Sequence, residues 1–198
     1  MSEGPTTEGP TTEPSGDPQS APPAAGEIAL LAGVQSALST PPVISVARAM
    51  SHFGEHAAGW VALSGVGALL SRRRRREWVL VGVGAVAAHA AAIAIKIVVR
   101  RARPNHPAVT VNVSTPSALS FPSAHATSTT AAAMLLCRAT RSPLPLAVVP
   151  LMALSRLVLG VHYPSDVVAG ALVGAAVAET VTRIAGPGRR QSSGDVGP

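Results

Sequence analysis

A histidine and an aspartate are spaced four residues apart at His162 and Asp166, near the carboxyl end of the sequence. If residues 162–166 form a helical turn, the two side chains share one face, and if Pro164 begins a turn between them they can still meet across it. A carboxylate that binds one imidazole nitrogen fixes the tautomer and leaves the other nitrogen free to attack an electrophile. This spacing therefore indicates a nucleophilic histidine.

Positive charge gathers beside one predicted loop. Lys96, the only lysine, lies near the end of an otherwise apolar segment, and Arg100, Arg101 and Arg103 follow it. Taken alone, Lys96 also fits a side chain that snorkels to a membrane surface. Four neighbouring cations, however, need an anion. Arg156 interrupts another apolar run, where it is costly unless it faces the interior of a helix bundle and a partner.

The sequence Pro122-Ser123-Ala124-His125 has the features of a helix start. Serine is a favoured N-cap, and the free N–H groups of a first turn, reinforced by the helix dipole, attract phosphate. Taken alone, these residues fit equally well an ordinary helix start followed by an interfacial histidine. Together with the separated cations and the histidine–aspartate pair, they supply what metal-free phosphoryl transfer needs, namely charge stabilisation, a nucleophile and a general acid.

These residues form three signatures, and with them the sequence resembles the type 2 phosphatidic acid phosphatases, a family that shares its phosphate site with vanadium-dependent haloperoxidases. The signatures are Lys96, six residues and Arg103-Pro104; Pro122-Ser123-Ala124-His125; and Ser155-Arg156, five residues, His162, three residues and Asp166. The second signature usually has glycine where this chain has Ala124, a small difference because the family uses the backbone N–H there. The resemblance covers about residues 50–185.

The resemblance implies a role for each matched residue. His162 would attack phosphorus, Asp166 would orient it, and His125 would protonate the leaving alkoxide and then activate water. No metal and no other cofactor is implied. The phosphate would be held by Lys96, Arg103, Arg156, Ser123 and the N–H group of Ala124. Four histidines match no signature and are interpreted as structural or interfacial: His52, His56, His89 and His106.

Membrane-spanning helices are the elements that must position these residues. Hydrophobic residues make up 47% of the chain and charged residues 13%, with a mean hydropathy of +0.34, which favours a membrane protein. Pro41 and Pro42 lie within the first apolar stretch, so five spans and an amphipathic segment are the alternative to six. We predict an all-α, polytopic transmembrane bundle of about six helices within a domain over 27–186. The apolar stretches lie at about 28–50, 53–71, 78–99, 124–137, 144–161 and 165–185.

The two ends of the chain differ from this domain in composition. Residues 1–26 are rich in Pro, Thr, Ser, Gly and Glu and contain no Lys or Arg, which predicts a disordered tail. Such a tail lacks the basic and apolar regions of a secretory signal. Residues 187–198 are expected to form a flexible carboxyl-terminal tail. Cys137 is the single cysteine, so we expect it to be a packing residue rather than part of a disulfide.

Arginines in two short loops and after the last apolar stretch predict an orientation. With six spans they fall on one side, which by the positive-inside rule is the cytoplasm, and the loop 100–122 with residues 162–164 then lies on the extracytoplasmic face of the cell membrane. We prefer this interpretation to a nucleic-acid patch, and expect no nucleic-acid partner. The arginines concerned are Arg72–Arg76, Arg138, Arg141, Arg183, Arg189 and Arg190.

Three other functions fit the sequence less well. The haloperoxidases are large soluble helical proteins, whereas this chain is short and apolar. A non-enzymatic scaffold would be favoured by loss of either signature histidine, and both are present. A transporter would carry charges along a path through the bilayer, whereas here they gather at one face. The expected function is therefore a metal-independent phosphatase whose partners are membrane lipids and a lipid-linked phosphate.

The substrate is less well defined by the sequence. Residues 51–56 and the Arg- and Ala-rich composition look most like bacterial phosphatases of this family that act on decaprenylphosphoryl-5-phosphoribose in arabinan-precursor synthesis. The alternatives are phosphatidic acid, phosphatidylglycerophosphate and polyprenyl diphosphate. Asn105, His106 and Asn112 are polar loop residues that would touch a sugar, or else are plain loop residues. The sequence leaves the oligomeric state open.

Overall fold

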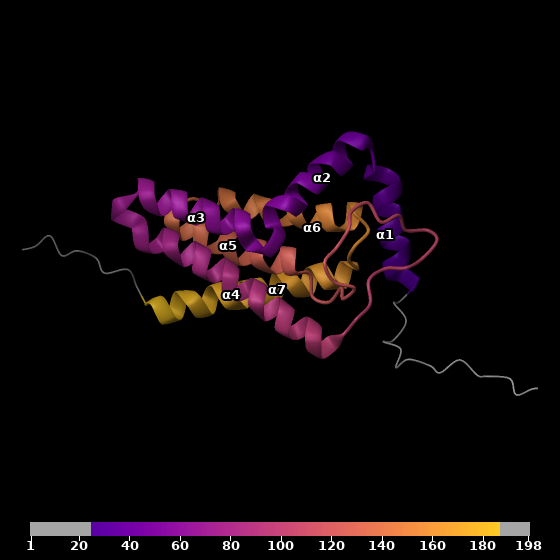
Figure 1. The fold of residues 1–198 in the computed structure, drawn as a ribbon. Helices are drawn as coiled ribbons and strands as arrows, with labels where there is room; N and C mark the ends of the chain where they lie inside the picture. Colours follow the sequence, from indigo (N-terminus) through magenta and orange to yellow (C-terminus); the bar gives the residue numbers. More distant parts are fainter. Residues whose placement is uncertain (1–24, 187–198) are drawn as a thin grey trace, which may run out of the picture.

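The structure is a computed structural model that describes residues 25–186. Residues 1–24 of the tail expected over 1–26, and all of the tail expected over 187–198, lie outside the described residues, whereas Ala25 and Gly26 belong to the first helix. Within the described part the protein is all-α, as predicted, with seven α-helices gathered into one elongated bundle (Figure 1). The helices are α1 (Ala25–Leu38), α2 (Pro41–Gly54), α3 (Ala58–Leu70), α4 (Arg75–Val99), α5 (Ala124–Thr140), α6 (Val148–Val158) and α7 (Pro164–Ala185).

The first predicted apolar stretch is broken where its prolines suggested. α1 ends at Leu38, and Pro41 and Pro42 occupy the first turn of α2, where the missing N–H of proline is tolerated. A short 3-10 turn, Glu55–Ala57, then separates α2 from α3. The expected stretches 28–50 and 53–71 therefore form three helices, so the six predicted stretches correspond to seven α-helices.

Two of these helices are long and apolar enough to cross a membrane, namely Arg72–Val99 and Pro164–Ala185. A third candidate arises if Ala25–Leu38 and Pro41–Leu70, bent by 117°, count as one broken span. The other helices of the described region are shorter or more polar. α6 has only 11 residues.

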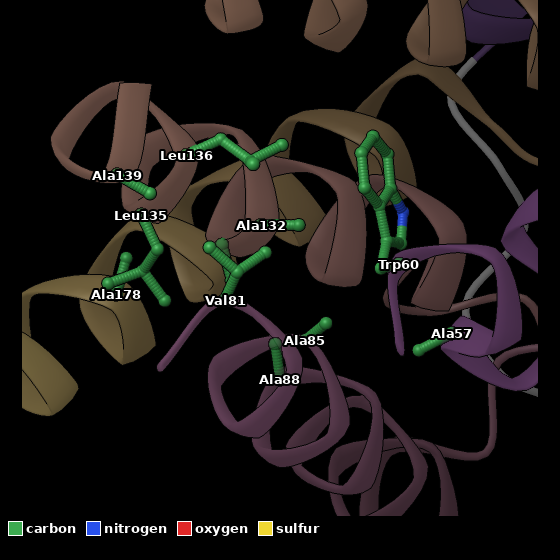
Figure 2. Packing of buried hydrophobic residues seen from close by; sticks show 11 residues of the cluster. Ala57, Trp60, Val81, Ala85, Ala88, Ala132, Leu135, Leu136, Ala139 and Ala178 are labelled. Atoms are coloured by element: carbon green, nitrogen blue, oxygen red, sulfur yellow. The ribbon is translucent and has the colours of Figure 1, made fainter. Parts of the chain in front are cut away.

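The central helix α5 packs against α4 and α7 (Figure 1). Its run Thr127–Thr130 is buried, so these hydroxyls are kept away from lipid. The apolar core around it consists mainly of alanines with a few larger side chains, including Trp60, Val81 and Leu135 (Figure 2). Small residues let helices approach closely, which is how membrane bundles gain packing energy without a hydrophobic driving force between helices.

The approach of α7 to α5 is especially close at Gly170. A Cβ atom at this position would lie 2.7 Å from the carbonyl oxygen of Ser123, so a larger residue would push the two helices apart. The amide of Ser123 also donates to the carbonyl of Asp166 over 2.9 Å. The beginnings of α5 and α7 are thus fixed side by side.

The arginine loop, which comprises Arg72–Arg76 around the start of α4, lies at the opposite end of the bundle. Arg74 donates to the carbonyl of Ala139 over 3.0 Å, near the end of α5, and Arg76 donates to the carbonyl of Ala185 at the end of α7. Cations are favourable at these positions because the last carbonyls of a helix have no partner within the helix.

Candidate active site

A cavity of about 350 Å³ opens at the end of the bundle away from the arginine loop. It is lined by the end of α4, the start of α5, α6, the loops that follow α4 and α6, and the turn between α2 and α3. Six of the eight predicted site residues contribute to its wall, and the other two, Ser123 and Asp166, are completely buried behind it. The six are Lys96, Arg103, Ala124, His125, Arg156 and His162.

The loop between α4 and α5 holds two cations at the cavity. Lys96 donates to the carbonyls of Leu119 and Ser120 over 2.9 and 3.0 Å. Arg103 donates from Nε to the carbonyl of Ser117 over 2.8 Å and from Nη1 to that of Val161 over 2.6 Å. Both side chains are therefore positioned by neutral carbonyl groups.

Arg156 reaches the cavity from α6, inside the bundle. It is 2% exposed and contacts neutral groups, with Nη1 donating to the hydroxyl of Ser51 over 3.0 Å. Among residues 25–186, no carboxylate forms an ion pair with Lys96, Arg103 or Arg156. Buried charges are normally paired. Lys96 and Arg156 are buried and Arg103 is half-buried, so three cations without a carboxylate partner surround one cavity, an arrangement that suits an external anion.

His162 and Asp166 meet across the start of α7. Asp166 Oδ2 accepts from the amide of Tyr163 over 2.8 Å and lies 3.6 Å from Nδ1 of His162, a little beyond hydrogen-bonding distance. On its other side, Nε2 of His162 lies 3.3 Å from Nη1 of Arg103. The carboxylate thus faces one ring nitrogen and the cationic cavity faces the other.

Burial lowers the pKa of the His162 imidazole to about 4, against the opposing influence of Asp166 and with the positive charges of Arg103 and Lys96 adding to the decrease. The imidazole is therefore neutral at pH 7, and a neutral imidazole has the lone pair that a nucleophile needs.

Ser123 and His125 hold the start of α5. Ser123 acts as the N-cap, because its Oγ accepts from the amide of Ala126 over 3.4 Å, and its hydroxyl is directed to its own helix. Ala124 lines the cavity in its place. Nε2 of His125 lies 2.9 Å from the carbonyl oxygen of Ser51, which fixes the ring at the cavity wall.

Arg101 is a residue of the site that the signatures do not include. Its Nη1 donates to Asp166 Oδ1 over 2.8 Å and its Nη2 to Glu27 Oε2 over 2.6 Å, and its guanidinium lies 4.1 Å from the centre of the Tyr163 ring. Burial alone would lower the pKa of Arg101, but the two carboxylates raise it above its ordinary value.

The sequence placed Arg101 in a group of four cations that needed an anion. The structure divides that group, because Arg101 pairs with protein carboxylates and Arg100 is exposed, which leaves Lys96 and Arg103 at the cavity. Glu27 comes from α1 and also accepts from the amide of Ser165 over 3.0 Å. Glu27 is far from the other site residues along the chain, so no local pattern in the sequence indicated these contacts.

The remaining polar candidates fall into two groups. His52, His56 and His89, which matched no signature, line the cavity, whereas Asn105 and His106 are exposed and do not. Asn112 uses its side-chain amide to bind the carbonyl of Val158 over 3.2 Å, so the structure gives it a loop-fixing contact.

A family model described as the PAP2 superfamily matches residues 77–189. The chain belongs to the PAP2 superfamily. The matched region contains all three signatures, and the members of this family with which the chain aligns over most of its length are phosphatases. This chain is accordingly a phosphatase, an enzyme that hydrolyses phosphate monoesters.

Two similar proteins are both named decaprenylphosphoryl-5-phosphoribose phosphatase. The one from Mycobacterium tuberculosis (strain CDC 1551 / Oshkosh) is 58% identical over 166 residues, which are 83% of this chain and 94% of the relative. The one from Mycolicibacterium smegmatis (strain ATCC 700084 / mc(2)155) is 63% identical over 146 residues, which are 73% of this chain and 81% of the relative.

A solved structure shares the fold of this PAP2 protein. The transmembrane PAP2-type phosphatidylglycerolphosphate phosphatase from Bacillus subtilis matches with a TM-score of 0.64 at 18% identity, over 82% of this chain and 87% of that chain. The helices α4 and α7, which are long and apolar enough to cross a membrane, are those of a membrane protein and agree with this shared fold.

Proposed function

We propose that this phosphatase removes the terminal phosphate from decaprenylphosphoryl-5-phosphoribose through a phosphohistidine formed on His162. The observation that carries the substrate is the identity of 58% and 63% to two enzymes of that name, over most of each chain. The three unpaired cations at the cavity support a phosphate as the bound group. Arg101 forms an ion pair with Asp166, so we do not include it among the residues that bind this phosphate.

In the first step, the lone pair on Nε2 of His162 attacks phosphorus. The bond between phosphorus and the sugar oxygen breaks, and the leaving alkoxide takes a proton from the imidazolium form of His125, which the Ser51 carbonyl oxygen and the negative charge of the bound phosphate stabilise. Lys96, Arg103, Arg156 and the N–H of Ala124 stabilise charge on the non-bridging oxygens, which is the main contribution a protein makes to phosphoryl transfer. Asp166 holds the ring and stabilises the positive charge that develops on it.

In the second step, water attacks the phosphohistidine. The water gives its proton to His125, the bond between phosphorus and Nε2 breaks, and inorganic phosphate leaves. The imidazole of His162 returns to its neutral form, and His125 has regained the proton that it donated in the first step. Each residue is thus ready for another turnover.

Phosphate release by the purified protein from a panel of lipids tests this proposal. The panel contains decaprenylphosphoryl-5-phosphoribose, phosphatidic acid, phosphatidylglycerophosphate and a polyprenyl diphosphate in matched detergent micelles, with His162→Ala as the inactive control. We expect the first lipid to have the highest kcat/KM. A tenfold preference for phosphatidic acid, about 1.4 kcal/mol in transition-state binding, would contradict the substrate and leave the phosphatase chemistry in place.

The same proposal places the cavity on the extracytoplasmic face of the cell membrane. It rests on the arginine loop, since the positive-inside rule puts such a loop in the cytoplasm and the cavity is at the other end of the bundle. In a Cys137→Ala background, a cysteine at Asn105 should react with an impermeant thiol reagent in intact cells. A cysteine at Arg74 should be protected, and the reverse labelling would overturn the orientation.

A further inference from the structure

A second pair of histidines lines the cavity beside the phosphate-binding cations. His56 comes from the 3-10 turn between α2 and α3, His89 comes from α4, and their ring centres are 5.7 Å apart. Neither residue belongs to a signature of the family, and neither has a part in the two chemical steps described above. Their place in the cavity wall therefore needs a different explanation.

The depth of this pair makes it unusual. His89 follows Arg75, the first residue of α4, by fourteen residues, or about 21 Å of helix rise, and Lys96 lies about 10 Å further along. With the arginine loop at one membrane surface, His89 lies within the hydrocarbon layer of about 30 Å, and the more exposed His56 lies beside it. Ionisable residues at such a depth are costly and normally have a partner or a function. Nδ1 of His89 is buried and has no hydrogen-bond partner within the described region.

The backbone at His56 carries strain. His56 and Ala57 have φ angles of 50° and 60°, a left-handed conformation that costs about 1 to 2 kcal/mol for a residue with a side chain. Packing keeps the turn in place, because Phe53 and Trp60 form an edge-to-face pair across it, and a Cβ at Gly54 would lie 2.6 Å from the ring of His125. Strain that the surrounding structure maintains is often found at ligand sites.

We infer that His56 and His89 form a second subsite, which binds the phosphodiester that joins the sugar to the polyprenyl chain of the substrate. This inference rests on the proposed function. The lipid chain extends toward the bilayer centre, so the phosphate nearer to the chain lies deeper than the terminal phosphate. The separation of about 10 Å between His89 and Lys96 along α4 matches the scale of a pentose with a phosphate at each end.

Neutral imidazoles are sufficient for this contact, since each can donate one N–H to a phosphodiester oxygen. Glu55 also lines the cavity, but it is half-exposed and its carboxylate faces His52, with Oε2 lying 3.8 Å from Nδ1. Phosphatidic acid has a single phosphate, so it would leave His56 and His89 without an anion. The subsite therefore selects lipids that carry a phosphodiester behind the terminal phosphate.

The test uses His89→Leu and His56→Gly in the full-length protein. Glycine accepts the positive φ at position 56, so this change removes the ring without adding backbone strain. His106→Ala is the matched control, because His106 is an exposed histidine outside the cavity. The first measurement is the ratio of kcat/KM for decaprenylphosphoryl-5-phosphoribose to kcat/KM for phosphatidic acid, which should fall at least tenfold in both cavity variants and stay unchanged in the control.

The second measurement is inhibition by decaprenylphosphoryl ribose, which keeps the phosphodiester and lacks the terminal phosphate, with an aryl phosphate as the substrate. The inhibition constant should rise at least tenfold in both cavity variants. An unchanged constant, or an equal loss of turnover for both lipids, would overturn the subsite. If the wild type does not hydrolyse the polyprenyl lipid, the proposed function fails, while the inhibition constant still decides whether the subsite exists.

Discussion

The two ends of the bundle use arginine in different ways. At one end, Arg74 and Arg76 donate to carbonyls at the ends of α5 and α7, and most of the loop that contains them is exposed. At the other end, Lys96, Arg103 and Arg156 are also held by neutral groups, but they are largely removed from solvent and face one cavity. The charges of the arginine loop are screened by solvent, whereas those at the cavity face only neutral carbonyl and hydroxyl groups within the described residues.

This difference shows that number and type of charge do not identify the functional end of the molecule. What identifies it is burial without a carboxylate partner. Arg101 confirms the distinction from within the site, because it lies in the same loop as Arg103 and yet is paired with Glu27 and Asp166. The comparison predicts a graded series of effects.

The largest effect is expected at the nucleophile. His162→Ala should lower kcat by about 10⁴-fold or more, because no other group can form the covalent intermediate, while added EDTA should leave wild-type activity unchanged. Phosphate release from the preferred lipid measures both. Activity that survives in His162→Ala would show that the unpaired cations alone carry the reaction.

A smaller loss is expected when one cavity cation is removed. Arg156→Gln should lower kcat by about 10²- to 10³-fold, as is typical when one stabiliser of transition-state charge is lost. Arg156→Lys keeps the charge and should retain part of the activity, which separates loss of charge from misfolding. Arg183→Gln is the matched control, since Arg183 is an exposed arginine paired with Glu179 on the surface of α7. An equal loss of kcat in Arg156→Gln and Arg183→Gln would contradict the distinction between buried cations at the cavity and exposed arginines.

Arg101 should give an intermediate effect of a different kind. Arg101→Gln should lower kcat by roughly tenfold through poorer positioning of Asp166 and His162. With the guanidinium gone, Asp166 can stabilise a protonated His162 more strongly, so the pKa of His162 should rise from about 4 toward its ordinary value.

A protonated imidazole cannot attack, so the acid limb of kcat/KM should move to higher pH in Arg101→Gln than in the wild type. Both proteins use the same lipid, so ionisation of the substrate phosphate cancels in the difference between their pH profiles. An unshifted acid limb with a reduced kcat would mean that Arg101 acts only on the folding of the loop.

The smallest effect is expected in the arginine loop. Arg74→Gln removes a favourable contact with the end of α5 and should lower the free energy of unfolding by less than about 1 kcal/mol, with unchanged kcat and KM. Thermal unfolding in detergent and phosphate release measure the two quantities. A loss of activity comparable to that of Arg156→Gln would mean that the two ends are coupled.

The sequence predicted those parts of the molecule whose information is local. Composition and apolar stretches predicted an all-α membrane bundle, and the spacing of Lys96, Arg103, His125 and His162 predicted residues that the structure brings to one cavity. The break near Pro41 was also visible, since proline has a defined effect on a helix.

The parts that the sequence missed depend on tertiary contacts. Glu27 meets Arg101, which lies 74 residues further along the chain, and neither residue carries a local sign of the other. The left-handed conformation at His56 and Ala57 was equally hidden, because alanine is not a residue that normally marks such a turn. His56 and His89 became candidates for function only when the fold placed them in the cavity wall.

The shortness of α6 has a consequence for the surrounding lipid. Even with the 3-10 turn Leu144–Ala147 that leads into it, the helix has 15 residues and rises about 25 Å, short of a hydrocarbon layer of about 30 Å, so we expect the bilayer to thin beside this helix or polar headgroups to descend toward it. This hydrophobic mismatch lies next to His162, the residue that the headgroup of the lipid substrate must reach. Turnover in reconstituted vesicles should therefore depend on acyl-chain length, with thinner bilayers delivering their headgroups to the enzyme more readily than thick ones.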